Sequence, residues 1–414
     1  MKKSLLFVAT PLILLAQNYS LPQLIAKAEQ HHQQLKAKGF QVKSATSQIE
    51  SVKNSFYPTI DISAKYTGVS PNSVISPRDT GTGAIAISYD IYDGGRKDAM
   101  LSAKQFEHQA SQFEKDAFAK SIVLDMTNRY YTIYKIRANL YALKEQSKEL
   151  VAQIKRIKKF YENGLATQEE IDKLLAVYEN NQYLVANTNM QLITQIENIR
   201  LATGIKVDGL KKNNYKEPNR VGYEKYEMSK IISANAKAVD ESAKAVDAGY
   251  MPQVVISDSY RRSTYGHVKE SPFGDGLLIE EENRLNLTIG MRVFDNGKMK
   301  KDSEALRYQK MALESNAIYA EQEQRMQYRL AKSRLQTLKD KQKSTQSALR
   351  ASKSTYDAIV IKFDAGAVDN ITYLDALNKL TLAEAIDKET QYDYEIAKSI
   401  YYYYAGKNPK EFIR

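Results

Sequence analysis

The stretch Tyr161–Gly164 (YENG) returns 202 residues later as Phe363–Gly366 (FDAG). About 65 residues with helical spacing and no proline precede each stretch, and about 35 more follow it. Glycine adopts a positive φ at little cost, which a tight reversal between two antiparallel helices requires. Each stretch therefore predicts a helical hairpin, and the fixed offset predicts that the hairpin is built twice.

Further landmarks support a duplication of the whole chain. Paired aromatic-proline and glycine motifs recur in the same order in both halves, which makes chance an unlikely cause. We divide the chain into a first repeat (17–205), a polar linker (206–223), a second repeat (224–407) and a tail (408–414). The landmark pairs are Phe56-Tyr57-Pro58 with Tyr250-Met251-Pro252, Tyr92–Gly95 (YDGG) with Phe294–Gly297 (FDNG), and Thr203-Gly204 with Ala405-Gly406.

The first 16 residues have the pattern of a secretory signal peptide. Two lysines precede an apolar run from Leu5 to Leu15, and the small residue Ala16 follows it. No later segment has 18 consecutive apolar residues, so the sequence predicts no transmembrane helix. If the exported protein enters a membrane, its strands must cross it.

The longest predicted helices are 97–161 and 298–363. Apolar residues recur at intervals of three, four and seven for about 40 residues of the first, which is typical of a coiled-coil seam. A 65-residue helix is about 100 Å long, too long for a compact domain. The shorter helices 22–54 and 168–202 would match that length end to end, as would 223–248 and 370–404 in the second repeat. The predicted seam is Ile122, Met126, Ile133, Leu140, Leu143, Leu150, Ile154, Ile157 and Tyr161.

Four stretches alternate between apolar and polar residues, at about 56–66, 83–92, 254–265 and 285–294. Each has the length of a tilted transmembrane β-strand. A half-buried sheet on a soluble core would show the same alternation. Lipid tolerates only closed barrels, and four strands do not close one around a useful lumen. In a membrane, several protomers must therefore share one barrel.

Composition and motifs argue against a catalytic, cofactor or metal site. The chain contains no cysteine, which excludes disulfides, thiolate metal sites and cysteine nucleophiles. Gly81–Ala86 fits a loose dinucleotide fingerprint, but it opens a strand and not a helix. His31 and His32 are adjacent and diverge on a helix, so they do not form a metal pair. We predict no enzyme, no cofactor and no metal site.

This order of elements resembles the outer membrane efflux protein family, the TolC-like channels. The most specific part is Gly366–Ala376, in which a glycine is followed by Leu-Asp-Ala, and 164–171 is similar to its first-repeat partner. The resemblance implies a mainly α-helical fold with transmembrane β-strands. It implies a homotrimer with a 12-stranded β-barrel in the outer membrane lipid, continued by an α-helical coiled-coil tunnel through the periplasm of a Gram-negative bacterium.

The resemblance also implies functional residues. Counting from the turn glycine, the family's ring of aperture aspartates falls on Thr372 and Asp375, and only Asp375 keeps a carboxylate. We expect Asp369 and Glu170 to contribute to the same periplasmic aperture. The helix-turn tips expected to dock a periplasmic adaptor (membrane fusion) protein are Gly164, Leu165, Gly366 and Ala367.

The family's closing links need a tyrosine and an arginine, and the matching positions here are Phe363 and Val368. Neither side chain makes those hydrogen bonds or ion pairs. Either other contacts hold the closed state, or the channel is leakier. The sequence leaves both alternatives open.

The predicted function is a passive exit duct of a tripartite efflux or type I secretion system. It would export small toxic compounds or proteins with an inner-membrane pump of the RND or ABC type. The alternative is a periplasmic coiled-coil scaffold or adaptor. The excess of 60 Lys and Arg over 49 Asp and Glu also suggests a nucleic-acid-binding coiled coil. The signal peptide argues against that alternative, so no nucleic-acid partner is expected.

Overall fold

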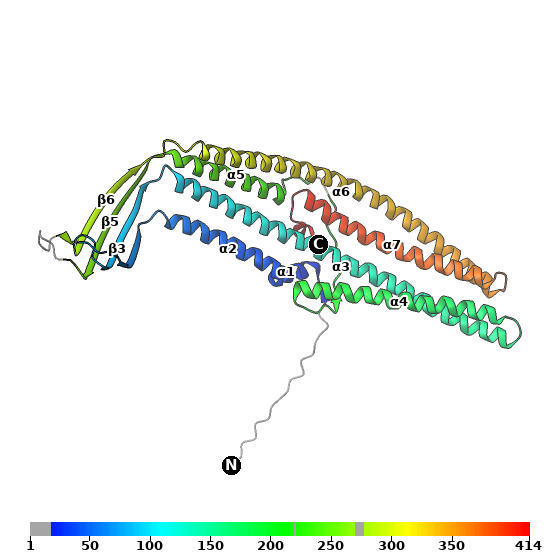
Figure 1. The fold of residues 1–414 in the computed structure, drawn as a ribbon. Helices are drawn as coiled ribbons and strands as arrows, with labels where there is room; N and C mark the ends of the chain where they lie inside the picture. Colours follow the sequence, from blue (N-terminus) through cyan, green and yellow to red (C-terminus); the bar gives the residue numbers. More distant parts are fainter. Residues whose placement is uncertain (1–17, 219–220, 270–276) are drawn as a thin grey trace, which may run out of the picture. The chain divides into compact units, whose positions relative to one another are not determined.

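The computed structural model describes residues 18–218, 221–269 and 277–414 (Figure 1). The predicted signal peptide, 1–16, lies outside the described residues. The chain forms two compact units, which we call the tip unit (up to residue 37, then 115–227 and 321–414) and the strand unit (38–114 and 228–320). Three helices contribute to both units: α2 (Gln33–Asn54), α3 (Arg96–Glu162) and α6 (Lys298–Asp364).

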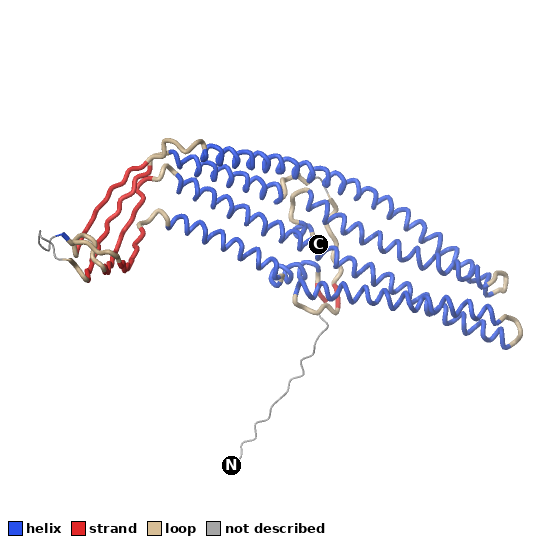
Figure 2. Tube along the Cα trace, viewed as in Figure 1, coloured by secondary structure: helices blue, strands red, loops and turns tan. Residues whose placement is uncertain are grey.

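The strand unit contains one antiparallel sheet with the order β2-β3-β5-β6, drawn in red in Figure 2. Directly paired residues share a face, so Ile60, opposite Ile87, and Asp61, opposite Ala86, mark its two sides. The Ile60 side is rich in exposed apolar residues and the Asp61 side is largely polar. The elements of this unit are β2 (Thr59–Gly68), β3 (Asp79–Tyr92), α5 (Glu227–Asp247), η1 (Ala248–Tyr250), β5 (Gln253–Gly266) and β6 (Glu281–Gly290).

The last strand lies four residues earlier than its alternation predicted. The sequence pattern indicated 285–294, but β6 ends at Gly290, which pairs with Gln253. Gln253 follows Pro252, which has no N–H to donate to a sheet ladder. Pairing stops at that residue, so Met291 and Val293 extend beyond the strand.

Aspartates cap both long helices where the chain leaves the sheet. The Asp93 carboxylate accepts the backbone N–H groups of Gly95 (3.1 Å) and Lys97 (2.9 Å). Asp295 does the same for Gly297 and Met299, at 2.9 Å each. This shared geometry gives the repeated Asp-x-Gly motif its physical reason, because it satisfies amides that a helix start leaves unpaired.

The tip unit contains the hairpins α3/α4 and α6/α7, which lie side by side in Figure 1. Its core gathers around Tyr130 and Tyr131 of α3, which are at most 1% exposed. Seven of the nine predicted seam residues are buried; Ile154 is half-buried, and Tyr161 is 47% exposed. The other elements of this unit are β1 (Asn18–Tyr19), α1 (Leu21–His31), α4 (Gln168–Thr203), β4 (Gly209–Leu210), α7 (Asn370–Tyr404) and η3 (Pro409–Phe412).

The first predicted helix is interrupted. The sequence predicted one helix over 22–54, but His32 has an extended backbone (ψ 112°) and separates α1 from α2. The His32 ring packs edge-on against Phe118, with 5.4 Å between centroids. This packing is a tertiary contact. The sequence at the break contains no proline or glycine from which the interruption could be predicted. In the part of the chain that is described, no helix is both long and apolar enough to cross a bilayer.

Candidate gate at the hairpin tips

The two helix reversals have the same backbone geometry. Gly164 and Gly366 both have a φ of 71°, the left-handed region that favours glycine. The amide of Leu165 donates to the Phe160 carbonyl (2.8 Å), and the amide of Ala367 donates to the Lys362 carbonyl (2.8 Å). These are Schellman motifs, which satisfy the carbonyls at a helix end. Leu165 is 75% exposed at its tip, and Ala367 is also exposed.

Three of the four residues predicted at the aperture take part in the N-terminal caps of the return helices. In the first hairpin, Glu170 accepts the Thr167 amide (2.9 Å) while Thr167 accepts the Glu170 amide (3.3 Å), a capping box. In the second, the Asp369 carboxylate accepts both the amide (2.9 Å) and the hydroxyl (2.6 Å) of Thr372. Cap formation alone therefore accounts for Glu170, Asp369 and Thr372 at these positions.

The Asp369 cap predicts acid sensitivity of the second tip. Hydrogen bonds from the Thr372 hydroxyl and amide hold the pKa of Asp369 below its usual value. The stabilisation is thus complete above the ordinary aspartate pKa of ~3.9 and is lost as the pH falls through the lower folded value. We expect Asp369→Asn, a neutral cap of similar quality, to remove this dependence. Thermal unfolding of both proteins between about pH 2 and 6 measures it; parallel profiles would contradict the assignment.

Asp375, the fourth predicted aperture residue, is exposed but not an isolated charge. Its carboxylate lies 2.6 Å from the Lys379 ammonium, one turn further along α7. The pair is a surface i to i+4 contact, weak in energy but close to neutral in charge. Any negative potential that Asp375 supplies is therefore reduced by Lys379. The spacing of the two residues was visible in the sequence, and the prediction overlooked it.

A contact between the hairpins centres on Arg156 of α3. Its guanidinium donates to the Asp364 carboxylate of α6 at 2.7 Å. The same group lies over the Phe363 ring, 4.7 Å from the centroid, in cation–π geometry. Phe363 cannot form the family's tyrosine link. Its ring instead makes a cation–π contact with an arginine of the first repeat.

A second contact between the hairpins uses Tyr373 of α7. This side chain is 1% exposed, and its ring stacks on Phe363 with 4.9 Å between centroids. Its hydroxyl donates to the Glu149 carboxylate of α3 at 3.1 Å and also meets the Tyr356 hydroxyl at 3.2 Å. Burial raises the pKa of Tyr373, so it stays a neutral donor. We call Arg156, Asp364, Phe363, Tyr373 and Glu149 the tip latch.

Sequence reasoning did not find the tip latch. Arg156 and Asp364 are 208 residues apart, so no local spacing links them. The family pattern directed attention to Phe363 and Val368, whereas the buried tyrosine lies ten residues after Phe363, on the next helix. Val368 packs beside the cluster formed by Phe363, Tyr373 and Leu377.

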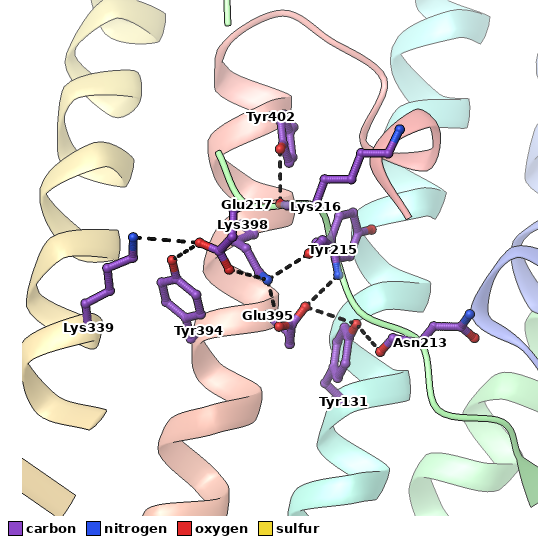
Figure 3. Close-up of polar contacts among 10 residues, drawn as sticks. All are labelled: Tyr131, Asn213, Tyr215, Lys216, Glu217, Lys339, Tyr394, Glu395, Lys398 and Tyr402. Atoms are coloured by element: carbon purple, nitrogen blue, oxygen red, sulfur yellow. Dashed lines mark hydrogen bonds and ion pairs between the residues drawn. The ribbon is translucent and has the colours of Figure 1, made fainter. Parts of the chain in front are cut away.

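Residues 206–218 of the linker pack over α3 and α7 and form a partly buried polar cluster with them (Figure 3). The Lys398 ammonium, 3% exposed, lies 2.7 Å from Glu395 and 3.2 Å from Glu217, and donates to the Tyr215 carbonyl (2.8 Å). Glu395 in turn accepts the Tyr215 amide at 2.6 Å. The linker is therefore a structural strap (206–218) and not a loose spacer.

The described residues contain no group of three histidine or acidic side chains that could hold a metal ion. The latch and the strap offer no paired nucleophile and base. The tip latch joins α3 to α6 and α7, and the Lys398 contacts join α7 to the strap.

Comparison with known proteins relates part of the chain to a family. The model of the family described as "Outer membrane efflux protein" matches residues 24–205. Comparison with curated protein sequences gives no match. The predicted resemblance, the non-enzymatic role and the outer-membrane location agree with this family.

Solved structures share the fold over nearly the whole chain. A membrane protein from Pseudomonas aeruginosa has a TM-score of 0.79 at 14% identity, covering 93% of both chains. The outer membrane protein VceC from Vibrio cholerae has 0.76 at 17% identity, covering 94% of this chain and 96% of that one. The CmeC outer membrane channel of Campylobacter jejuni has 0.77 at 14% identity, covering 93% and 85%. At these identities the likeness establishes the fold, including that of the second repeat.

Proposed function

We propose, from the premise that residues 24–205 belong to the outer membrane efflux protein family, that this protein is the outer-membrane exit duct of an export system. Three copies would share one 12-stranded barrel, and their helices would form the periplasmic tunnel. The duct would be passive, because the pump in the inner membrane supplies the energy. VceC and CmeC, to which the fold is similar, are described as an outer membrane protein and an outer membrane channel.

The observation that carries this proposal is the open sheet. Its edge strands β2 and β6 have no partner on their outer sides among the described residues. Unpaired edges are untenable in lipid, so a membrane sheet of this kind needs further copies to close it. One face is suited to lipid, because its apolar side chains are exposed by 43 to 80%: Ile60, Ile62, Ile85, Ile87, Leu285, Leu287 and Ile289.

The opposite face is suited to a water-filled lumen. Arg261 and Arg284 both donate to Glu282 at 2.5 Å, and they share this side with Asp61 and Ser63. Polar and charged side chains on the inner face are typical of transmembrane β-channels.

The partners follow from the same role. The exposed tips at Leu165 and Ala367 would contact a periplasmic adaptor, which connects the duct to an inner-membrane pump of the RND or ABC type. The expected cargo is small toxic compounds or, in a type I secretion route, proteins. In the resting state, the tip latch would take the place of the family's closing links.

Conductance in a planar lipid bilayer tests the duct and the aperture together. We expect discrete steps from detergent-extracted protein. If Asp375 lines the path, Asp375→Ala leaves Lys379 unpaired and shifts the reversal potential toward anion selectivity. Lys379→Ala is the matched control and shifts it the opposite way.

Each other outcome has a definite meaning. Steps with no shift in either variant would keep the duct and move the aperture away from Asp375. Protein that stays soluble without detergent and gives no steps would refute the duct and favour a periplasmic scaffold.

A further inference from the structure

A straight stripe of positive charge runs along α6 within the tip unit. Starting at Arg325, basic residues or glutamines occur at alternating intervals of four and three for 28 residues. All nine side chains are exposed in the single chain, and no acidic residue interrupts the stripe. The members of this cationic stripe are Arg325, Arg329, Lys332, Gln336, Lys339, Lys343, Gln346, Arg350 and Lys353.

The stripe is not the core seam of α6. Ala331, Leu335 and Leu338, which are at most 7% exposed, form the buried side of this helix. The spacing of the stripe is that of a coiled-coil seam, which stays straight along a helix packed against a partner. Seam positions normally carry apolar residues, so a seam of exposed cations points to a partner of opposite charge.

Within the described residues, most of the stripe has no acidic partner. Arg325 pairs with Glu321 at 2.9 Å, and Lys339 lies 3.7 Å from Glu217 of the strap. The remaining five cations form no ion pair among the residues that the structure describes. An open groove of about 740 Å³ adjoins the stripe at Arg329, Lys332 and Lys339, with Tyr394 and Tyr401 on its far wall.

In the first repeat, the strap covers the face of α3 that corresponds to the start of the cationic stripe. Subtracting 202 places the start of the stripe on Val123, Thr127, Tyr130 and Tyr134 of α3. The strap lies on this face: Tyr134 donates to the Leu210 carbonyl (3.2 Å), Tyr130 donates to the Lys211 carbonyl, and Thr127 meets the Tyr215 hydroxyl (2.7 Å). The chain covers this face in the first repeat and leaves its cationic counterpart largely open in the second.

We propose that the cationic stripe of α6 is a docking track for an acidic α-helix of a partner protein. The partner's carboxylates would recur at intervals of three and four residues, to match the cations at one per turn. In a second copy of this chain, helices α4 and α2 match the track poorly. Its α4 carries five acidic residues at irregular spacing, and its α2 carries four lysines against one glutamate. The track is separate from the tips at Leu165 and Ala367, and its occupation does not depend on conduction.

A binding measurement on the full-length, detergent-solubilised protein tests the track. The probe is a synthetic 28-residue alanine-rich helix with glutamates at alternating three- and four-residue intervals. A peptide of the same composition with shuffled glutamates is its control. We expect the spaced peptide to bind about tenfold more tightly, because each exposed ion pair contributes up to a few-fold in affinity. Binding should weaken as salt rises.

Two matched variants separate the stripe from the overall charge. Lys332→Gln/Lys343→Gln/Arg350→Gln should lower the affinity about tenfold. Arg334→Gln/Lys341→Gln/Lys362→Gln removes the same charge from other faces of α6 and should change it less than about twofold. Equal losses of affinity in the two triple variants, or equal binding of the spaced and shuffled peptides, would overturn the proposal. Either result would indicate that the stripe binds anionic polymers in general. Loss of the oligomer in the stripe variant alone would overturn it in favour of a second copy.

Discussion

Replacing Lys398 with methionine is expected to cost about 3–5 kcal/mol of unfolding free energy. The ammonium is 3% exposed and bridges Glu395, Glu217 and the Tyr215 carbonyl. Its removal leaves the Glu395 carboxylate, 13% exposed, without its cation in a largely desolvated site. Denaturant unfolding of the detergent-solubilised protein, followed by circular dichroism, measures the loss.

The control variants separate charge from packing. Lys339→Met removes a half-exposed ammonium near the same Glu217, 3.7 Å away, and should cost less than about 1 kcal/mol. Adding Glu395→Gln to Lys398→Met should recover much of the loss, because no unpaired buried charge remains. A Lys398→Met protein as stable as Lys339→Met would show that the strap is not held by this cluster.

Breaking the tip latch is expected to raise the resting conductance. Arg156→Gln removes the ion pair with Asp364 and the cation–π contact with Phe363. Tyr373→Phe keeps the stacked ring and removes only the hydroxyl that donates to Glu149. Each link is worth about 1 kcal/mol, so the double variant should shift the closed-to-open ratio by at least about tenfold.

Single-channel recording without an adaptor measures this shift as open probability. The control is Lys155→Gln, one residue before Arg156, because Lys155 has no ion pair among the described residues. This variant removes the same charge and should leave the open probability unchanged. An equal rise in both charge variants would trace the effect to surface potential. An unchanged double variant would place the closing contacts outside the tip latch.

Much of the architecture could be predicted from the sequence, because helix ends, helix starts and strand alternation are local or periodic signals. Glycine at a positive φ ends the helices at Gly164 and Gly366, and Asp93 and Asp295 start the long helices. The alternation of the strands located the sheet, with an error of four residues in β6, whose boundary was decided by Pro252, the residue just before β5. The resemblance to the efflux family is confirmed over residues 24–205.

The candidate gate was harder to predict from the sequence than the fold. Asp369, Thr372 and Glu170 have local capping bonds that Ser/Thr/Asp spacing rules anticipate. The i to i+4 position of Lys379 relative to Asp375 was also readable. Whether any of the four lines an aperture stays a prediction, because it depends on how the three copies of the proposed trimer are arranged.

By itself, the sequence determined the duplication, the helix ends and the two-faced strands, because backbone preference and side-chain period act within a few residues. Only the tertiary structure decided which distant groups meet. Arg156 reaches Asp364, Tyr373 reaches Glu149, and Lys398 reaches the strap across more than 170 residues of chain. Such pairings depend on how the helices pack side by side. A charge or hydroxyl on one helix face has many possible partners until that packing brings one of them within hydrogen-bond distance.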